Sequence, residues 1–574
     1  MYNNTKVFQN KRLEMNTTNQ YPYENLDNYV LPDLLDRSIK LYGPLDAFGF
    51  VGTKPISYNE FNERVQNLIQ LLMSNGISKG DKVVLLSENM PNWGVAYFAV
   101  TYFGAVVVPV LPDFHPSDVH HIMKHSEAKA VIVSDRHLAT IEDDTDSNLD
   151  FVVNLETLSL IDNLCNQSYL TQIKKKIISN KINRPEENDL CAIIYTSGTT
   201  GNSKGVMLSH KNLTTNALST FCKVEILKTD VWLSILPLAH TLECTVGLIV
   251  PILHGSSVYY VDKAPTPSVL LKAFNIVKPT MMLSVPLIIE KIYKNKVLAK
   301  FNSSFITKNL YKISFFRKKL NKIAGKKLLE TFGGRIRFFG IGGAGLSPIV
   351  EQFLFEADFP YIIGYGLTET SPLIAGGSIL GHVKKVKSTG TAFYGVDLKI
   401  KNPDSTTGKG EIIARSPSIM LGYYKDEQQT KEVMEDDWFL TGDLGYIDED
   451  GYLFISGRSK NVIIGSGGEN IYPEQIESII NNESTVIDSL VMEDSNGKVI
   501  ARIHLDLEII DNMFKGYKVP EHEVAEHISK HLEDMRVDIN SRISSFSKIT
   551  KYIHQIEPFT KTPTKKIKRY LYKS

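Results

Sequence analysis

From residue 56 to residue 460, the chain alternates segments of helical periodicity with short runs of β-branched residues. Residues 82–86, 130–133 and 192–195 are examples of such runs, and Tyr58–Met73 is one of the helical segments. Alternation of this kind indicates α/β layers, in which helices cover sheets whose strands are largely parallel. The sequence therefore predicts a large α/β unit with parallel-rich sheets.

Two further regions predict additional units, since 574 residues are too many for one ordinary domain. Around Asp397–Tyr424 short strands are divided by Gly and Pro, which indicates a small antiparallel subdomain. After Arg458 begins a compact region of about 115 residues, which is long enough to be a domain. We expect an N-terminal domain over residues 1–458 and a small α+β C-terminal domain over residues 459–574.

The overall charge is balanced, with 64 Lys and Arg against 64 Asp and Glu. This balance favours neither a nucleic acid nor an acidic partner. Four cysteines without paired spacing indicate reduced thiols in a cytoplasmic protein, not a disulfide framework or a metal site. The first residues lack the apolar core of a signal peptide, so we expect that they do not form one.

One uncharged segment, residues 92–112, is long enough to resemble a membrane span. Gly104 and Pro109 interrupt it, and β-branched residues gather only in its second half. These features favour a helix over Trp93–Phe103, a turn at the glycine and a strand over Ala105–Leu111.

A second unusual segment, residues 291–327, is strongly basic and has no acidic residue. Large apolar residues are interleaved with its cations, as in a basic amphipathic helix that lies on an anionic membrane surface. An ordinary surface helix with a solvated lysine face is the alternative. The cations are Lys291, Lys294, Lys296, Lys300, Lys308, Lys312, Arg317, Lys318, Lys319, Lys322, Lys326 and Lys327.

The loop after the apolar run 191–195 has the chemistry of an anion site. It holds three glycines, several hydroxyl side chains and Lys204. Glycine lets backbone amides approach an anion closely, and successive amides, hydroxyls and a lysine together suit a polyphosphate. A flexible surface turn is the alternative. A P-loop is excluded, because no Gly directly precedes Lys204 and no Ser or Thr follows it.

The order of residues over Tyr195–His210 resembles the phosphate-binding signature of the AMP-forming acyl-activating superfamily, which includes acyl-CoA synthetases, peptide-synthetase adenylation domains and luciferases. Ser203 stands where many members have Pro, a difference that removes no phosphate ligand. The resemblance implies the nucleotide-binding positions Thr196, Ser197, Gly198, Thr199, Thr200, Gly201 and Lys204.

A second pair of motifs resembles the superfamily's nucleotide site. Phe339–Ala344, with Gly343 and Ala344, is similar to the segment beside the adenine. The segment Gly364–Thr370 is a far more specific sign of the superfamily than this glycine cluster. By resemblance, its Gly364, Tyr365 and Gly366 contact the nucleotide, with the tyrosine ring against the adenine.

Two residues of the same motif are expected at the phosphates. The resemblance implies that Thr368 bonds a phosphate oxygen and that Glu369 holds Mg²⁺ together with Thr196. Mg²⁺ prefers hard oxygen ligands and commonly shares them with substrate phosphates, which suits this assignment.

The ribose is expected to contact Asp443, in Thr441–Gly445, and Arg458. A carboxylate can accept both ribose hydroxyls, and a guanidinium presents a planar fork of donors. Lys460 falls where members of the superfamily hinge, so the resemblance implies a mobile C-terminal domain. Gly467 and Gly468 lie in a loop that lines the coenzyme A tunnel in relatives, and Pro473 is a good helix start.

Near the end of the chain, Phe559–Arg569 resembles the superfamily's final motif, whose catalytic lysine precedes an Ile/Val-x-Arg sequence. This spacing assigns the catalytic lysine to Lys566, although Lys565 stands where many relatives have Gly. Composition alone would favour a basic, solvated tail.

The segment Leu236–Glu243 resembles the long-chain branch of the superfamily, in which a histidine of this loop lines the acyl pocket. This assigns His240 to that wall, and the sequence around Val285–Pro286 fits the same branch. A histidine beside apolar residues is otherwise most often a satisfied core residue.

The resemblance implies an AMP-forming acyl-CoA ligase that uses ATP, Mg²⁺ and coenzyme A on a carboxylic acid, which we interpret as a long-chain fatty acid. An enzyme that transfers an aryl or other acid to a carrier-protein thiol is the first alternative, and a non-catalytic nucleotide-binding protein is the second. A luciferase-like oxidase also shares the fold. We expect a cytoplasmic protein, with peripheral contact at the inner membrane face through residues 291–327. Acyl chain length and oligomeric state are not encoded in any motif.

Overall fold

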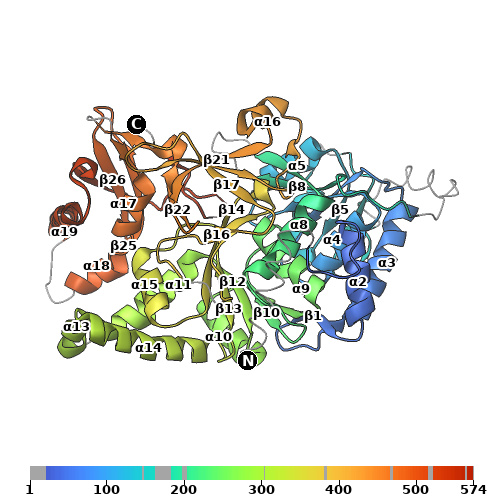
Figure 1. The fold of residues 1–574 in the computed structure, drawn as a ribbon, viewed down its shortest axis with the longest axis horizontal. Coiled ribbons are helices and arrows are strands. Elements are labelled where there is room, and N and C mark those ends of the chain that lie inside the picture. Colours follow the sequence, from blue (N-terminus) through green and yellow to red (C-terminus); the bar gives the residue numbers. More distant parts are fainter. Residues whose placement is uncertain are drawn as a thin grey trace.

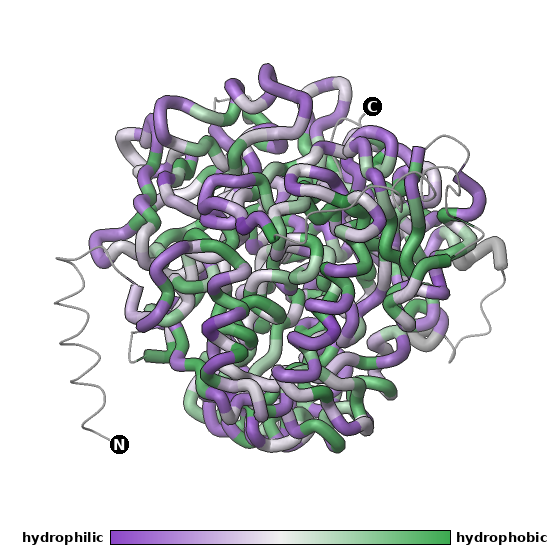
Figure 2. The backbone as a smooth tube through the Cα atoms, turned by 90° about the vertical axis from the view of Figure 1, so that its right-hand side faces the viewer, coloured by the Kyte–Doolittle hydropathy of each residue, from purple (hydrophilic) through white to green (hydrophobic). Residues whose placement is uncertain are grey.

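The computed structural model describes residues 21–144, 148–161, 164, 182–196, 203–302, 304–380, 384–465, 469–514, 521–562 and 565–572. Within these residues, two large sheets and the helices around them form most of the molecule, and smaller sheets occupy its C-terminal side (Figure 1). Apolar segments fill the interior, and polar segments are concentrated in outer loops (Figure 2).

The first large sheet has a parallel centre and antiparallel edges. Its strands β8, β4, β3, β5 and β6 are mutually parallel, and β9, β19 and β7 pair antiparallel to their neighbours. In spatial order the described strands are β19 (Gly422–Tyr423), β9 (Lys204–Ser209), β8 (Leu190–Thr196), β4 (Val106–Val110), β3 (Lys82–Leu86), β5 (Ala128–Val133), β6 (Phe151–Asn154) and β7 (Ser159–Leu160).

The second large sheet follows the same plan. Strands β14, β13, β12, β10, β11 and β1 run parallel, and β16, β15 and β2 close its two edges in the antiparallel sense. The described order is β16 (Thr391–Ala392), β15 (Leu373–Gly376), β14 (Tyr361–Gly366), β13 (Phe338–Ile341), β12 (Met281–Ser284), β10 (Val231–Ser234), β11 (Ser257–Tyr260), β1 (Asp46–Phe50) and β2 (Ile56–Ser57). The predicted α/β fold with parallel-rich sheets is confirmed.

Helices α4 (Pro91–Tyr102), α8 (His210–Ser219) and the π-helix η4 (Glu243–Ile249) lie between the two large sheets. Helix α4 packs on β3 and β4 of the first sheet and on β1 of the second. The remaining helices of this unit pack around these layers: α2 (Leu31–Tyr42), α3 (Tyr58–Ser74), α5 (Pro116–Ser126), α6 (Leu138–Glu142), α9 (Val250–His254), α10 (Pro267–Val277), α11 (Pro286–Ile292) and α15 (Pro348–Glu356).

The predicted helix Tyr58–Met73 corresponds to α3, and its start has a local cause. The Ser57 hydroxyl accepts a hydrogen bond from the Glu60 amide at 3.2 Å, and the Glu60 carboxylate accepts one from the Ser57 amide at 2.6 Å. This capping box satisfies two amides that the first turn leaves without helical partners. The helix therefore begins at Tyr58.

The uncharged segment 92–112 is part of the core. It forms α4, a turn at Gly104 with φ of 79°, and strand β4, as predicted within a residue or two. Side chains on every side of α4 are buried, because sheets and helices surround it. In the described part of the chain, no helix combines the length and the apolar character needed to cross a membrane.

The predicted antiparallel subdomain is present, with a larger extent. It contains β17 (Asp397–Lys401), β18 (Gly410–Arg415), β20 (Met434–Glu435), β21 (Trp438–Ile447) and β22 (Leu453–Arg458), all paired in the antiparallel sense. Helix α16 (Glu427–Val433) connects into β20. Strand β19, which the sequence assigned to this unit, instead extends the first large sheet by pairing with β9.

The residues after Arg458 build their own sheets and apolar core. The described strands are β23 (Ile463–Ile464), β24 (Asn470–Ile471), β25 (Val486–Glu493), β26 (Val499–Leu505) and β27 (Lys551–His554), with helices α17 (Pro473–Ile480), α18 (Leu507–Phe514) and α19 (Glu521–Arg542). One apolar cluster draws its buried residues from Leu31 to Leu453, and a separate cluster draws its own from Ile463 to Tyr552.

The basic segment 291–327 is not one amphipathic helix. The structure divides it into the π-helix η5 (Tyr293–Leu298), α12 (Ala299–Asn302), α13 (Phe305–Tyr311) and most of α14 (Ser314–Thr331). Its first part is built into the core, because Tyr293, Val297 and Phe301 are buried. Ile313 has an extended backbone that separates α13 from α14.

Candidate functional site

Asp443 and Arg458 lie opposite each other on the antiparallel strands β21 and β22. The Asp443 Oδ1 atom is 2.8 Å from Arg458 Nε, and its Oδ2 atom accepts a hydrogen bond from the Tyr365 hydroxyl at 2.8 Å. Burial raises the pKa of Asp443, and the charge of Arg458 opposes that rise. Each carboxylate oxygen can accept a second hydrogen bond, so the pair remains able to bind two hydroxyls.

Glu369 lies in the short helix η6 (Thr368–Thr370), directly after β14. Its Oε1 atom accepts a hydrogen bond from the Tyr423 hydroxyl at 2.9 Å, and Lys204 Nζ lies 5.2 Å from the centre of the Tyr423 ring. Burial and then the Glu369 charge raise the pKa of Tyr423, so its hydroxyl keeps its proton and donates. Tyr423 therefore connects Glu369 with Lys204.

Sequence reasoning missed Tyr423. The residue is part of β19, whose pairing with β9 brings it beside Lys204, and no motif used above includes it. The available signal was the dipeptide Gly422-Tyr423 shortly before the Asp443 motif, but its meaning depends on strand pairing across the sheet.

The chain around Lys566 forms a tight turn on the surface of the C-terminal region. Lys561 and Ile567 form a β-bridge, and the Lys566 amide donates to the Thr562 hydroxyl at 3.1 Å. Lys561 Nζ is 2.7 Å from the Asp488 carboxylate, and on the other side of the turn the Arg569 guanidinium pairs with Glu477. These two ion pairs anchor the turn to β25 and α17.

Lys566 and Lys565 face different partners. The charge of Lys566 interacts with Glu369, Asp443 and Arg458, and desolvation lowers its pKa most, followed by the nearby Arg458. The residue nevertheless keeps an exposed surface. Lys565 instead pairs with the exposed Asp113 carboxylate at 3.2 Å. The structure thus brings Lys566 to the acidic residues of the site.

Other cations gather at the same place. Desolvation lowers the pKa of Lys460 most, and the charges of Arg458 and Lys204 lower it further. The charged form of a lysine whose pKa is lowered by neighbouring cations would be stabilised by a polyanion placed beside it. Such convergence of positive charge favours a polyphosphate ligand.

The loop that the sequence predicts to bind an anion connects β8 to β9. Thr196, at the end of β8, is directly opposite Lys204, at the start of β9. The residues described by the structure do not include Ser197, Gly198, Thr199, Thr200 and Gly201 of this loop. They also do not include Gly467 and Gly468, which the resemblance assigns to the coenzyme A tunnel. The described parts of the hairpin hold Thr196 and Lys204 side by side at the adjoining ends of β8 and β9.

The Gly364–Thr370 motif enters the site from β14 of the second sheet. A side chain at Gly366 is impossible without movement, because its Cβ would lie 1.7 Å from the Pro372 carbonyl oxygen. Gly364 and Tyr365 precede it in the same strand, and Thr368 begins η6 beside Glu369. Close backbone approach therefore explains the glycine at this position. Tyr365, Thr368 and Glu369 lie near one another because they belong to one short run of the chain.

The glycine-rich segment after β13 lies next to the two segments assigned to the acyl pocket. A Cβ at Gly342 would be 3.0 Å from Leu242 Cδ2, and one at Gly343 would be 3.9 Å from Val285 Cγ1. Gly343, with φ of 86°, and Ala344 are exposed. The three segments therefore meet at one point.

His240 is part of the loop Leu236–Glu243 and is partly buried. Burial lowers its pKa to about 4, with Lys566 as a second cause, so the ring is neutral at pH 7. Its Nδ1 atom accepts a hydrogen bond from the Leu242 amide at 3.2 Å. A neutral imidazole fits an apolar wall better than a charged one.

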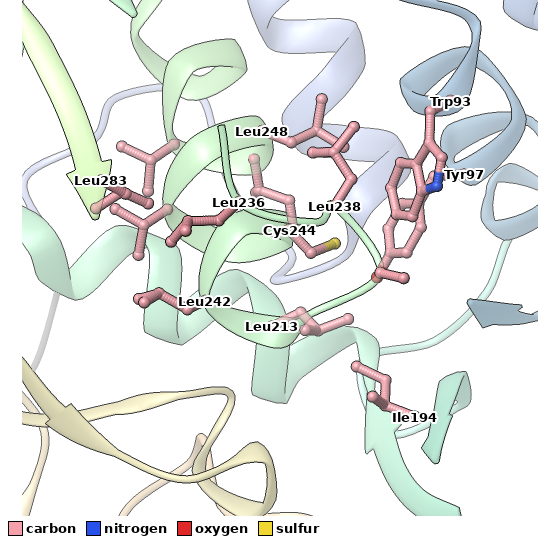
Figure 3. Close-up of a cluster of buried hydrophobic side chains, with 14 of the residues drawn as sticks. Trp93, Tyr97, Ile194, Leu213, Leu236, Leu238, Leu242, Cys244, Leu248 and Leu283 are labelled. Atoms are coloured by element: carbon pink, nitrogen blue, oxygen red, sulfur yellow. The ribbon is translucent and has the colours of Figure 1, made fainter. Parts of the chain in front are cut away.

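An apolar cluster includes leucines of the His240 loop, Leu236–Glu243 (Figure 3). Trp93 and Tyr97 of α4 stack at 5.3 Å, and leucines of the loop and of η4 lie to one side of them (Figure 3). Glu243 is buried at the start of η4, where Ser234 donates a hydrogen bond to it at 2.6 Å, and burial raises its pKa to about 8. The labelled residues of the cluster are Trp93, Tyr97, Ile194, Leu213, Leu236, Leu238, Leu242, Cys244, Leu248 and Leu283.

A magnesium ion would have to share its ligands with a substrate. In the part of the chain that the structure describes, no three His, Cys, Asp or Glu side chains gather in a way that could hold a metal ion. Glu369 is half-buried and accepts a hydrogen bond from Tyr423, and Thr196 lies opposite Lys204 at the base of the β8–β9 loop. One carboxylate and one hydroxyl fit Mg²⁺, which usually keeps waters and completes its shell with phosphate oxygens.

Comparisons with known proteins identify the family. The model of the AMP-binding enzyme family matches residues 36–424. The long chain acyl-CoA synthetase 7, peroxisomal, of Arabidopsis thaliana is 30% identical over 575 residues, which cover 90% of this chain and 79% of that protein. The long-chain-fatty-acid–CoA ligase heimdall of Drosophila melanogaster is 29% identical over 538 residues, which cover 86% of this chain and 78% of the relative.

Solved structures confirm the fold. ATP-bound MatB from Rhodopseudomonas palustris matches with a TM-score of 0.72 at 23% identity, over 95% of this chain and 98% of that one. The O-succinylbenzoate coenzyme A synthetase MenE from Bacillus subtilis, in complex with AMP, matches with a TM-score of 0.70 at 20% identity, over 94% and 98% of the two chains. Since the family model covers more than half of the chain, this protein belongs to the family of AMP-binding enzymes.

Proposed function

We propose that this chain is an AMP-forming acyl-CoA ligase that converts a long-chain fatty acid, ATP and coenzyme A into the acyl-CoA thioester, AMP and pyrophosphate. The observation that carries the proposal is the convergence of Lys204, Glu369, Asp443, Arg458 and Lys566 in one site. The names of the relatives, which are long-chain fatty acid ligases, support the substrate class.

The first step forms a bond between a carboxylate oxygen of the acid and the α-phosphorus of ATP, and pyrophosphate leaves. Two negative groups must meet, so catalysis depends on positive charge placed in advance. Lys204 would face the phosphates from the β8–β9 loop, and Lys566 would approach from the C-terminal region. Mg²⁺, held by Glu369 and Thr196, would neutralise phosphate charge. Holding the acid and ATP in line supplies the rest of the acceleration.

Asp443 and Arg458 would bind the ribose hydroxyls, and Tyr365 would lie beside the adenine with Gly343, Ala344, Gly364 and Gly366. Thr368 would bond a phosphate oxygen. The Tyr365 hydroxyl already donates to Asp443 at 2.8 Å, so adenine and ribose positions are coupled through one hydrogen bond.

The second step forms a bond between the coenzyme A sulfur and the acyl carbon. AMP leaves with the electrons of the broken bond, and the thiol loses its proton to solvent. The present arrangement, with Lys566 among the acidic residues, suits the first step. We propose that the C-terminal domain, residues 459–574, then rotates at Lys460, so that Lys566 leaves and the loop containing Gly467 and Gly468 approaches. The separate apolar cores before and after this point support the division at residue 458.

A long-chain acid is favoured by the apolar surroundings of the His240 loop. Leu242, Val285 and the glycine-rich segment meet there, and the neutral His240 adds no charge. We further propose that the protein works in the cytoplasm and contacts the inner face of a membrane through residues 291–327. The three described cysteines are free thiols, which fits a reducing compartment.

The proposal is tested by thioester formation with ATP and coenzyme A, across saturated acids from acetate to stearate and with benzoate. AMP and pyrophosphate are quantified in the same reactions. A maximum at long chains, with AMP as product, is expected. Pyrophosphate release without thioester would assign the final acceptor to a carrier-protein thiol, and a maximum with benzoate would exclude the fatty acid.

A further inference from the structure

Helices α13 and α14 form an outer edge of the molecule below α15 (Figure 1). This helix pair, residues 304–331, leaves large apolar side chains in water. Phe305 is 83% exposed, Ile306 69% and Phe315 62%, and Ile313, Phe316 and Ile323 are also exposed. Isolated exposed apolar residues are normal on a protein surface, but several on one short element indicate an interaction site.

Cations share the outward face of α14 with these apolar residues. Phe315, Lys319, Ile323 and Lys327 follow one another at intervals of four residues, so they lie in a row along one side of the helix. Lys319 Nζ lies 4.4 Å from the centre of the Phe315 ring. Among the described residues, no carboxylate forms an ion pair with Lys308, Lys312, Lys318, Lys326 or Lys327.

The inward face of the helix pair fixes its position. Arg317 and Asn321 both donate to the buried Glu356 of α15, at 2.8 Å each, and Tyr311 stacks on Phe301 at 4.7 Å. The contacts with Glu356 involve a buried carboxylate, and the ring contact adds an apolar anchor. The outward face is therefore displayed on a rigid base, and Arg317 belongs to that base and not to the exposed set of cations.

The first third of the basic segment packs inside the protein and contacts the C-terminal region. Lys294 donates to the carbonyl oxygens of Glu483 and Val486 in the C-terminal region, at 3.0 and 3.1 Å. Tyr293, Val297 and Phe301 are buried around it. The sequence of residues 291–327 therefore combines an internal part, up to residue 302, with an exposed part that begins at residue 304.

The geometry points to docking of the outward face of α13 and α14 on an anionic lipid surface. This inference rests on the proposed function, and it narrows the membrane contact to residues 304–327. Phenylalanine and isoleucine side chains would enter the boundary of headgroups and acyl chains, and lysines would extend to the lipid phosphates. Charge complementarity favours an anionic surface, since this face has positive charge and the segment has no acidic residue.

Vesicle sedimentation tests the inference directly. The full-length protein is mixed with phosphatidylcholine vesicles, with and without phosphatidylserine, over a series of salt concentrations. We expect strong binding only to the vesicles that contain phosphatidylserine, and weaker binding as salt rises. Absence of binding to those vesicles, or equal binding to both kinds, would overturn the inference.

Two variants locate the contact. Phe305→Ser/Ile306→Ser/Phe315→Ser removes exposed apolar groups, and Lys319→Gln/Lys326→Gln/Lys327→Gln removes charge. Each lysine at an anionic surface strengthens binding about fivefold, so the charge variant should bind about a hundredfold more weakly. A matched control is Lys40→Gln/Leu41→Ser, an exposed pair on α2 at the opposite end of the molecule (Figure 1). If both test variants bind the vesicles as strongly as the wild type does, the assignment of the contact to the outward face of α13 and α14 is refuted.

Two further measurements separate this inference from the proposed function and from a second copy of the chain. The apolar variant should retain thioester formation with a short, water-soluble acid and lose it with a fatty acid dissolved in phosphatidylserine vesicles. Loss of activity in the wild type with every acid would refute the function, whatever the vesicle result. A concentration-dependent dimer that the apolar variant abolishes, seen by gel filtration, would assign the face to a second copy instead.

Discussion

Tyr423→Phe tests whether a hydrogen bond to Glu369 organises the phosphate side of the site. The substitution removes only the hydroxyl, which is 2.9 Å from Glu369 Oε1, and keeps the ring that Lys204 faces at 5.2 Å. A hydrogen bond to a charged group contributes about 1.5–3 kcal/mol. If this free energy serves to position Glu369, kcat/KM for ATP should fall about 10- to 150-fold at limiting Mg²⁺.

The assay is pyrophosphate–ATP exchange over a series of Mg²⁺ concentrations. We expect a higher Mg²⁺ concentration at half-maximal rate and partial recovery at saturation. Tyr424→Phe is the matched control, because the Tyr424 hydroxyl is 3.4 Å from the exposed Glu127 and should matter little. Thermal unfolding of both variants measures any general loss of stability. An unchanged Mg²⁺ dependence in Tyr423→Phe would refute the reasoning.

Three further predictions follow from the structure. Lys566→Met should slow adenylation about a hundredfold or more but spare thioester formation from synthetic acyl-AMP. The control Lys565→Met, at the exposed contact with Asp113, should slow neither step. Equal losses in the two variants would contradict the assignment of Lys566 as the catalytic lysine. Lys294→Met removes two hydrogen bonds that hold the C-terminal region in the present arrangement. It should therefore lower the rate of pyrophosphate–ATP exchange more than the rate of thioester formation. Equal effects on both rates would show that these hydrogen bonds do not favour the present arrangement. Burial raises the pKa of Glu243 to about 8 from an ordinary value of 4.5, so the folded state binds a proton that the unfolded state releases between these values. The free energy of unfolding should therefore fall as pH rises from about 4.5 to 8, by up to roughly 5 kcal/mol, and Glu243→Gln should flatten this slope in urea titrations; an unaltered slope would mean that Glu243 is not its source.

The basic segment, residues 291–327, illustrates which structural features could be predicted from the sequence and which could not. Its composition correctly indicates helices and a strongly basic surface, because both properties follow from the residues themselves. It does not reveal that Tyr293, Val297 and Phe301 are buried, or that Arg317 pairs with Glu356 of α15. Those facts depend on which distant elements the segment packs against. The predicted membrane contact consequently has a smaller extent than the sequence suggested, and it stays a prediction.

The sequence by itself determined the layers of this protein and the chemistry available to it. Alternating periodicities specify helices and strands locally, and the capping box of Ser57 and Glu60 shows how neighbouring residues alone can start a helix. The motifs likewise name a phosphate loop, an acidic residue after β14 and a terminal lysine, because each is a continuous run of residues. The roles assigned to these residues remain predictions.

Only the tertiary structure decided which of these groups act on one another. Glu369 receives its hydrogen bond from Tyr423 because β19 joins the first sheet, and Lys566 rather than Lys565 faces Asp443 because the terminal turn is anchored to α17 and β25. Such pairings join residues far apart in the chain. Their geometry depends on the packing of whole sheets and domains, which no local pattern of side chains specifies.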